Sequence, residues 1–341
     1  MDRMSDWHTQ LIAAGANFGG DGLISDFGEP LDEMAALQGG TTVVPLVKTG
    51  LISVSGDDAS SFLNAQLTSD VGAASPSRAQ YSGYCTPKGR LLATMLLCAQ
   101  DEDYLLVLPE EIAQPVADRL RKYVLRAKAK LDSTGPGTAM FGVCGARASE
   151  AVADGLSLPA MDADFRICRT DDGVTAVSLP GNRTLVMCQA ADAASTWQNL
   201  LANARPAGSH VWALQTIRAG IATITAATQE MFTPQMVALD TFGGVSFEKG
   251  CYPGQEIVAR TRYLGVVKRR LYRGSCAQAV VPGATVVATK DGKSVGTVTD
   301  ATSADAGRWE FLAVLQREAV TSDLALQLQD GGALAIDSAV E

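Results

Sequence analysis

Histidine is scarce in this chain, which has only His8 and His210 among its 341 residues. The seven cysteines are never closer than 13 positions apart and form no Cys-x-x-Cys pair. A zinc or iron–sulfur site held by this protein alone therefore has little support in the sequence. A cysteine protease would need a histidine base with an orienting partner, and neither histidine stands in such a motif. Scattered thiols in odd number indicate a reducing compartment rather than a disulfide framework.

Long apolar runs are also missing. No stretch approaches the roughly 18 apolar residues that a membrane span needs, and residues 1–8 lack the basic start and apolar run of a signal peptide. We therefore expect a cytoplasmic protein without a membrane partner. The glycine pairs at 19–20, 39–40 and 243–244 form neither a Gly-x-Gly-x-x-Gly fingerprint nor a P-loop. Nucleotide binding of those types is not expected.

The composition is that of an ordinary globular protein, with 47% hydrophobic and 19% charged residues. A chain of this length is too long for one compact core of usual size, so we expect two or three domains. The net charge of −9 argues against a generic nucleic-acid coat, because phosphate binding usually shows as an excess of Lys and Arg.

Two basic runs interrupt the acidic background. They carry no acidic residue among them and comprise Arg119, Arg121, Lys122, Arg126, Lys128 and Lys130, and then Arg260, Arg262, Lys268, Arg269, Arg270 and Arg273. A charge run is usually a solvated face. Guanidinium groups also bind carboxylate or phosphate in bidentate fashion, so a local anion site is the second interpretation.

The first half of the chain predicts an α+β arrangement. Residues 1–43 are rich in Gly, Asp and Ala, and we expect a short helix around 7–14 in an irregular lead-in that is the least ordered part of the chain. Residues 43–54 are strand-like, and Asp57 is a candidate N-cap for a helix whose apolar side includes Phe62 and Leu67. Residues 90–99 and 103–108 resemble paired strands, followed by a helix over 110–125 and a short extended segment at 127–131.

The second half repeats and then changes this pattern. Strands and a helix at 197–204 recur between Phe165 and Arg205. After Lys268 the sequence becomes a series of short strands separated by turns. Asp291-Gly292 between two β-prone runs is a hairpin signal, and four or more such strands predict a small barrel.

The strongest candidate for chemistry is the octapeptide at 249–256, Lys-Gly-Cys-Tyr-Pro-Gly-Gln-Glu. The ammonium of Lys249 near the thiol of Cys251 would favour the thiolate, and a helix starting after Gly254 and stopping at Gly265 would favour it further. The alternative is a buried structural thiol, since free cysteine is among the most buried residue types. Cys98 and Cys188 lie in apolar strands, where a packing role is expected.

Residues 244–260 closely resemble the signature of the YgfZ family, folate-binding relatives of the glycine-cleavage T-protein (aminomethyltransferase). Residues 56–71, the Cys-Thr-Pro-Lys-Gly-Arg segment at 85–90 and Phe-Thr-Pro-Gln at 232–235 agree with that family in the same order. The resemblance implies two ferredoxin-like lobes around a central folate channel and a small C-terminal β-barrel. The domains would be a lead-in at 1–43, a first lobe at 44–145, a second lobe with the Lys-Gly-Cys-Tyr motif at 146–266, and a barrel at 267–341.

The resemblance also implies a set of site residues. Cys251 would be the redox-responsive thiol, with Lys249 as its electrostatic activator and Tyr252 beside it. The residues that would bind tetrahydrofolate, or a one-carbon derivative of it, are Trp212, Gln255, Glu256, Arg260, Gln66 and Lys88. Two departures from the family pattern stand out: Thr49 lies near the position of a second folate-contacting tryptophan, and Ala238 lies where many relatives carry Asn.

Three functions follow from these observations. The first is a tetrahydrofolate-binding protein that supports assembly or repair of iron–sulfur clusters in client enzymes, including those that thiolate tRNA. The second is a folate-dependent aminomethyl or methyl transferase, but Arg90 and the residues to Leu96 lack the catalytic aspartate that T-proteins place there, so proton handling is missing. The third is a tRNA-binding module. The basic runs would suit the polyglutamate tail of folate or the tRNA backbone, and the sequence does not choose between them.

Overall fold

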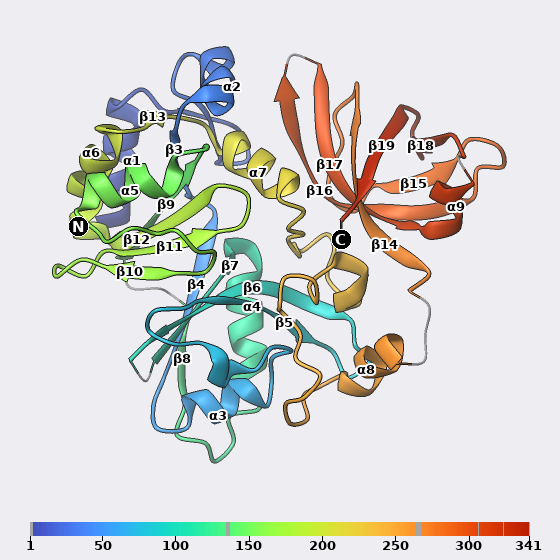
Figure 1. The fold of residues 1–341 in the computed structure, drawn as a ribbon, viewed down its shortest axis with the longest axis horizontal. Coiled ribbons are helices and arrows are strands. Elements are labelled where there is room, and N and C mark those ends of the chain that lie inside the picture. The colour runs from blue at the N-terminus through green and yellow to red at the C-terminus, as the bar shows by residue number, and fades with distance from the viewer. Residues whose placement is uncertain are drawn as a thin grey trace. The chain divides into compact units, whose positions relative to one another are not determined.

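A computed structural model describes residues 3–101, 103–133, 137–263, 267–305, 307–322 and 324–340. Its chain divides into two compact units (Figure 1). Unit 1 comprises Met1–Thr49, Pro76–Ala79 and Thr134–Gln215, and unit 2 comprises Gly50–Ser75, Gln80–Ser133 and Thr216–Glu341. Each unit therefore combines segments that are far apart in the sequence.

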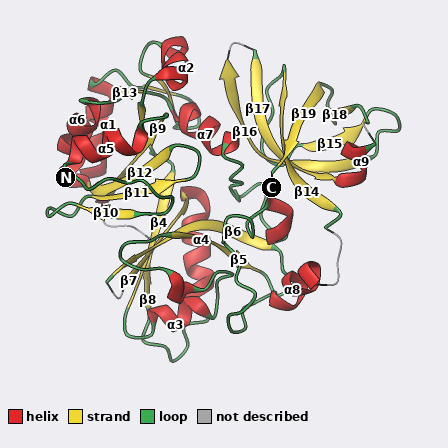
Figure 2. Ribbon diagram, viewed as in Figure 1, coloured by secondary structure: helices red, strands yellow, loops and turns green. Residues whose placement is uncertain are grey.

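Unit 1 is built on a six-stranded sheet with the order β10-β11-β12-β9-β3-β13 (Figure 2). Its strands are β3 (Thr42–Pro45), β9 (Thr138–Cys144), β10 (Ile167–Arg169), β11 (Thr175–Leu179), β12 (Arg183–Gln189) and β13 (Arg205–Pro206). A small hairpin of β1 (Asn17–Phe18) and β2 (Ile24–Asp26) precedes them. The helices are α1 (Arg3–Ala13), α2 (Pro30–Gly39), α5 (Ala148–Leu156), η3 (Ala190–Asp192), α6 (Ala193–Leu201) and α7 (Ser209–Arg218), which runs into unit 2.

The N-terminal segment is part of the core of unit 1, which corrects the expectation of a poorly ordered lead-in. Trp7 on α1 is 5% exposed and makes edge-to-face contacts with Phe141 and Trp197, with ring centroids 5.6 and 6.1 Å away. Burial of an aromatic side chain of this size contributes roughly 2–3 kcal/mol, which is enough to fix a short helix on a sheet. Composition did not predict this because the apolar partners come from residues more than 130 positions later.

The α+β part of unit 2 has a five-stranded sheet with the order β5-β6-β7-β4-β8. Its strands are β4 (Thr49–Ser55), β5 (Gln80–Cys85), β6 (Leu91–Gln100), β7 (Asp103–Pro109) and β8 (Lys130–Asp132). Its helices are α3 (Ala59–Asn64), η1 (Val71–Ala73), α4 (Glu110–Arg121), η4 (Pro234–Val237) and α8 (Gln255–Tyr263). The paired strands expected at 90–99 and 103–108 are confirmed as β6 and β7. Every residue of β6 except Gln100 is buried, which explains its continuous apolar run.

The remainder of unit 2 is a closed six-stranded barrel. It consists of β14 (Arg269–Cys276), β15 (Thr285–Ala288), β16 (Ser294–Asp305), β17 (Arg308–Gln316), β18 (Leu326–Leu328) and β19 (Ala333–Ala339), with α9 (Arg317–Thr321) after β17. The hairpin expected at Asp291-Gly292 joins β15 to β16. The α+β class and the small C-terminal barrel expected from the sequence are therefore confirmed.

The division into units differs from the domain boundaries expected from the sequence. Strand β9, expected in the first lobe, pairs with β12 and β3 in unit 1. The Lys-Gly-Cys-Tyr motif, expected in the second lobe, lies in unit 2 with residues 50–75 and 80–133. Strand pairing between remote segments decides which unit a segment belongs to, and the local composition does not reveal this pairing.

Several element ends also differ from the expected ones. Helix α3 has Asp58, and not Asp57, at its N-cap, and the Asp58 carboxylate accepts a hydrogen bond from the Lys128 N–H at 2.8 Å instead of capping the helix. The helix expected to reach residue 125 ends at Arg121, and the one expected at 197–204 spans 193–201. Gly265, the expected stop of the helix after Cys251, lies outside the described residues.

Candidate functional site

Two tight turns of unit 2 interlock beneath the cysteine motif. One turn spans 86–89, where the Gly89 N–H donates to the Thr86 carbonyl at 2.9 Å. The other contains Gly254, whose φ of +83° is in the left-handed region. A Cβ on Gly254 would lie 2.6 Å from the Thr86 carbonyl oxygen and 2.6 Å from the Gly89 Cα. The two segments that carried the family resemblance, 85–90 and 249–256, are thus in direct backbone contact.

Cys251 is the one exposed thiol among the seven cysteines, since the other six are buried. It follows Gly250, around which a Cβ would meet nothing within 4 Å. The nearby Cys85 is 2% exposed, and burial raises the pKa of its thiol to about 12. The part of the motif that is free to meet another molecule is therefore Cys251, whereas Cys85 has the setting of a structural thiol.

Lys249 fixes the loop to the segment after α3. Its Nζ donates hydrogen bonds to the carbonyl oxygens of Asn64, Leu67 and Ser69, the last two at 2.9 and 2.8 Å. Burial lowers the pKa of Lys249 to about 8, and the carboxylate of Asp70 acts in the opposite direction. Three carbonyl acceptors hold the protonated form. The ammonium thus anchors the loop, and its role as an activator of Cys251 stays a prediction.

Two buried side-chain oxygens in the segments that Lys249 joins have no hydrogen-bond partner among the described residues. One is the Tyr252 hydroxyl, on a side chain that is 6% exposed, and the other is Gln66 Oε1, on a side chain that is 9% exposed. The Lys249 Nζ lies 5.4 Å from the centre of the Tyr252 ring, and Gln66 belongs to the turn whose carbonyls bind Lys249. Burial raises the pKa of Tyr252, and the Cys85 thiol adds to this effect. A buried polar atom of this kind needs a partner, which an ordered water or a ligand can supply.

The remaining predicted residues of unit 2 lie around the same turns. Gln255 donates from Nε2 to the Lys249 carbonyl at 3.5 Å, which closes the loop on itself. Glu256, Arg260 and Lys88 are exposed, and none of the three side chains forms a hydrogen bond or ion pair with another described residue. Their side chains are therefore accessible to a ligand.

Trp212 belongs to unit 1, whereas the cysteine motif belongs to unit 2. Its indole lies directly against β9, where a Cβ on Gly142 would come within 2.1 Å of the ring. The Arg183 guanidinium is 5.2 Å from the centre of the ring, a cation–π distance. Trp212 is partly buried, so its place in unit 1 has a packing explanation, and its contact with folate stays a prediction.

Sequence reasoning missed Thr68 as a residue that positions the motif. Its hydroxyl donates to the Gly244 carbonyl at 2.6 Å and accepts from the Gly83 N–H at 2.8 Å. Its own carbonyl accepts from the Ser246 N–H at 2.9 Å. Thr68 thereby joins the start of the motif segment to β5, and its distance from Gly244 in the sequence left no local signal.

The departure at Ala238 also has a structural consequence. Ala238 ends η4 with φ 55° and ψ 24°, in the left-handed region. Asn and Gly adopt this conformation at a lower cost than Ala does. The backbone at this position is thus one that the Asn implied by the family resemblance would adopt readily.

Strand β6, which covers the segment where the T-protein resemblance implied a catalytic aspartate, contains no carboxylate. In β6, Thr94 donates from its hydroxyl to the Ala222 carbonyl at 3.2 Å and accepts from the Ile224 N–H at 3.1 Å. These bonds tie β6 to the segment that follows α7. Thr94 thus has a structural role and cannot exchange a proton near neutral pH as a carboxyl group can.

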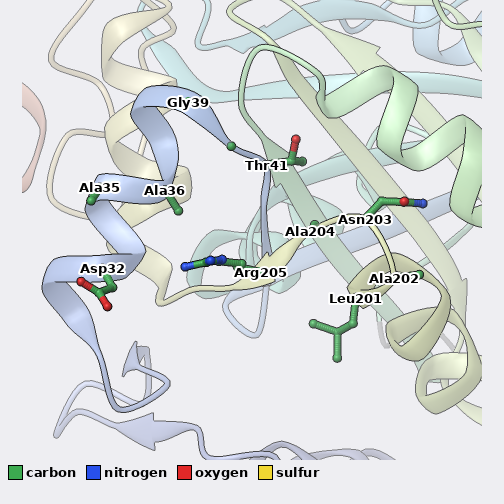
Figure 3. A pocket seen from close by; sticks show the side chains of 11 residues that line it. Asp32, Ala35, Ala36, Gly39, Thr41, Leu201, Ala202, Asn203, Ala204 and Arg205 are labelled. Atoms are coloured by element: carbon green, nitrogen blue, oxygen red, sulfur yellow. The ribbon is translucent and has the colours of Figure 1, made fainter.

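A pocket of about 660 Å³ lies in unit 1, between the end of α2 and the chain from α6 into β13. Figure 3 shows its lining residues, which include Asp32, Thr41, Asn203 and Arg205. None of the predicted site residues lines it. Among the described residues, no helix is long and apolar enough to cross a membrane.

Comparison with known proteins places these features in context. The GCVT N-terminal domain family matches residues 4–246. The tRNA-modifying protein YgfZ of Edwardsiella ictaluri (strain 93-146) is 37% identical over 229 residues, covering 66% of this chain and 68% of that protein. The tRNA-modifying protein YgfZ of Yersinia pestis (strain Pestoides F) is 28% identical over 303 residues, covering 86% and 91%.

A solved structure confirms the fold expected from the resemblance. The glycine cleavage system aminomethyltransferase T from Bartonella henselae matches with a TM-score of 0.80, covering 97% of this chain and 96% of that chain. The two sequences are 18% identical, so this likeness concerns the fold alone.

Proposed function

The chain belongs to the GCVT N-terminal domain family and within it to the YgfZ proteins, and we propose that it binds tetrahydrofolate and supports iron–sulfur enzymes that modify tRNA. The observation that carries the proposal is one constellation in unit 2. An exposed thiol, Cys251, lies on a loop anchored by Lys249, next to the unpartnered buried oxygens of Gln66 and Tyr252.

The unpartnered oxygens fit a folate in their chemistry. A pterin is a flat ring with an amino group, an amide and ring nitrogens along its edge. Gln66 Oε1 would accept a hydrogen bond from an N–H of this edge, and the Tyr252 hydroxyl would donate to one of its acceptors. Neutral partners suit a neutral ring, because a buried charge would be costly there. When bound, tetrahydrofolate supplies a nitrogen that carries a one-carbon group.

The proposed role of Cys251 is that of a redox-responsive thiol that faces client proteins. Its exposure gives access, and it lies three residues before Gly254, whose backbone contact with the 86–89 turn attaches this loop to the rest of unit 2. The clusters themselves belong to the clients. We place this function in the cytoplasm, where thiols stay reduced and tRNA is present.

The transferase alternative is the weaker one. T-protein chemistry needs an acid–base group near the folate nitrogen, and β6 contains no carboxylate. Formation of methylene-tetrahydrofolate from an aminomethyl donor would restore this alternative.

Calorimetric titration of the reduced protein with tetrahydrofolate and 5-formyltetrahydrofolate tests the folate half of the proposal. Tyr252→Phe and Gln66→Leu each remove one of the orphaned oxygens, and each should weaken binding by about tenfold, the equivalent of one hydrogen bond of ~1.4 kcal/mol. Cys251→Ser is the matched control in the same loop and should bind folate as the natural chain does. Equal affinity in all four proteins would refute this ligand site.

The client half needs a cellular measurement. Cells without this gene should lose activity in tRNA-thiolating iron–sulfur enzymes, and the natural gene should restore it. The Cys251→Ser gene should not restore it, although its protein accumulates normally. Unchanged activity of the tRNA-thiolating enzymes in the deletion strain would refute the client part of the proposal.

A further inference from the structure

Arg262 and Tyr263, at the end of α8, contact Phe247, a partly buried ring two positions before Lys249. The Arg262 guanidinium lies 4.2 Å from the centre of the Phe247 ring, within the range of a cation–π contact. Phe247 in turn meets Tyr263 edge to face, with ring centroids 6.2 Å apart and an interplanar angle of 77°. Tyr263 is 67% exposed. An aromatic ring held by neighbours but open to solvent is ready to stack with another flat group.

The surface around these three side chains is basic. Val258 is the one buried residue of α8, and both Arg260 and Arg262 are exposed. Five cations of the second basic run form no ion pair or hydrogen bond with another described side chain. They are Arg260, Arg262, Lys268, Arg269 and Arg270. These cations therefore make no direct ion pair among the described residues, although the exposed carboxylates of Glu248 and Glu256 lie in the same segment and the whole protein carries a net charge of −9.

We propose that this surface, formed by Phe247, Arg260, Arg262 and Tyr263, binds an unpaired segment of RNA, with a base on Tyr263 and phosphates on the arginines. Exposed aromatic rings that alternate with cations are the general means of holding single strands, because every base has a face to stack and every nucleotide has a phosphate. Arginines without ion pairs among the described residues attract a polyanion to this face of an acidic protein.

The proposal rests on the proposed function and extends it: the proposed clients modify tRNA, and this surface would let the protein itself hold an unpaired segment of that RNA. An unpaired loop would be held by α8, whose first residue lies four positions after Cys251 in the chain. The surface itself makes no covalent change in the RNA; it is a binding surface on the segment that carries the exposed thiol.

Fluorescence anisotropy with a labelled 12-nucleotide single-stranded RNA, and with a duplex of equal length, tests the proposal in the full chain. Tyr263→Ala should weaken single-strand binding by about tenfold, whereas Tyr263→Phe, which keeps the ring, should stay within twofold. Duplex binding should not depend on Tyr263. Arg260→Ala and Arg262→Ala should each weaken binding and lower the salt dependence of log K by about 0.7 per removed phosphate contact.

Lys293→Ala is the control for general charge, because Lys293 is an exposed lysine of the barrel region that is paired with Asp291. It should leave RNA binding unchanged. Absence of single-strand binding at low salt, or equal binding by Tyr263→Ala, would overturn the proposal. The proposal would also be overturned if the variants bound RNA normally but no longer bound an acidic client protein. Folate titration of Tyr263→Ala separates the RNA-binding proposal from the folate-binding proposal. A variant that loses RNA binding but binds folate normally has lost only the function of this surface.

Discussion

Gly254 and Gly89 lie with their backbones in contact, so that a Cβ on Gly254 would fall 2.6 Å from the Gly89 Cα. Gly254 also has φ +83° and Gly89 has φ +68°. Each of the two turns thus needs glycine for its own conformation, and the contact needs the absence of a side chain. This contact fixes the loop of Cys251 to the end of β5.

Gly254→Ala should be strongly destabilising, because Gly254 has a positive φ and because its Cα packs against the Gly89 backbone. A left-handed alanine costs roughly 1–2 kcal/mol, and the clash with backbone adds to this, so we expect a loss of about 3 kcal/mol. Gly250→Ala is the matched control, because it lies in the same loop, has no positive φ and has open space around it. Urea unfolding measures both variants. A Gly254→Ala protein as stable as the control would show that the turns separate freely.

Lys249→Met should release the loop from the segment after α3. The three carbonyls that Lys249 holds would lose a charged donor, and a hydrogen bond to a charged group contributes about 1.5–3 kcal/mol. We expect the free energy of unfolding to fall by about 2 kcal/mol. Lys88→Met is the control, since Lys88 is exposed on the neighbouring turn. Similar unfolding curves for both variants would argue against the anchoring role.

Asp300→Asn should change how stability depends on pH. Asp300 accepts hydrogen bonds from the Thr223 N–H at 3.1 Å, yet burial raises its pKa to about 7 from an ordinary value of 3.8. The folded state therefore binds more protons than the unfolded state between about pH 4 and 7, so the contribution of Asp300 to stability decreases as the pH rises through this window. The Tm of Asp300→Asn, relative to the natural protein, should rise by about 3 °C or more from pH 4.5 to 8.

The control for this pH dependence is Asp291→Asn. Asp291 is hydrogen-bonded to Lys293, and this bond lowers the pKa of its carboxyl. Its contribution has the opposite sign and is small, because the pair is exposed. Parallel Tm curves for the natural protein and Asp300→Asn across this pH range would contradict the assignment to Asp300.

The thiols should divide into one that reacts quickly and six that do not. Cys251 is exposed and the others are buried, so the folded protein should show a single fast equivalent with a thiol reagent at pH 8. Cys251→Ser should remove this fast phase, and Cys85→Ser should keep it. Two or more fast equivalents in the natural protein would mean that the fold opens at a second cysteine.

Part of this molecule was predictable because its signals are local. The continuous apolar run of β6, the Asp291-Gly292 hairpin and the helix after Gly254 follow from residues within a few positions of one another. The candidate site was found because Lys249, Cys251 and Gly254 are neighbours in the chain. The role of Thr68 and the burial of Trp7 could not be found in this way, since their partners lie far along the sequence.

The sequence by itself determined the fold class, the barrel and the segment that carries the exposed thiol, because periodicity and turn chemistry act over short distances. Only the tertiary structure decided what the side chains of that segment contact. It placed the Lys249 ammonium on three carbonyls, left the Tyr252 hydroxyl without a partner among the described residues, and put Gly254 against Gly89. These relations depend on which remote strands and turns meet, and the free energy of burial, summed over the whole chain, selects that arrangement.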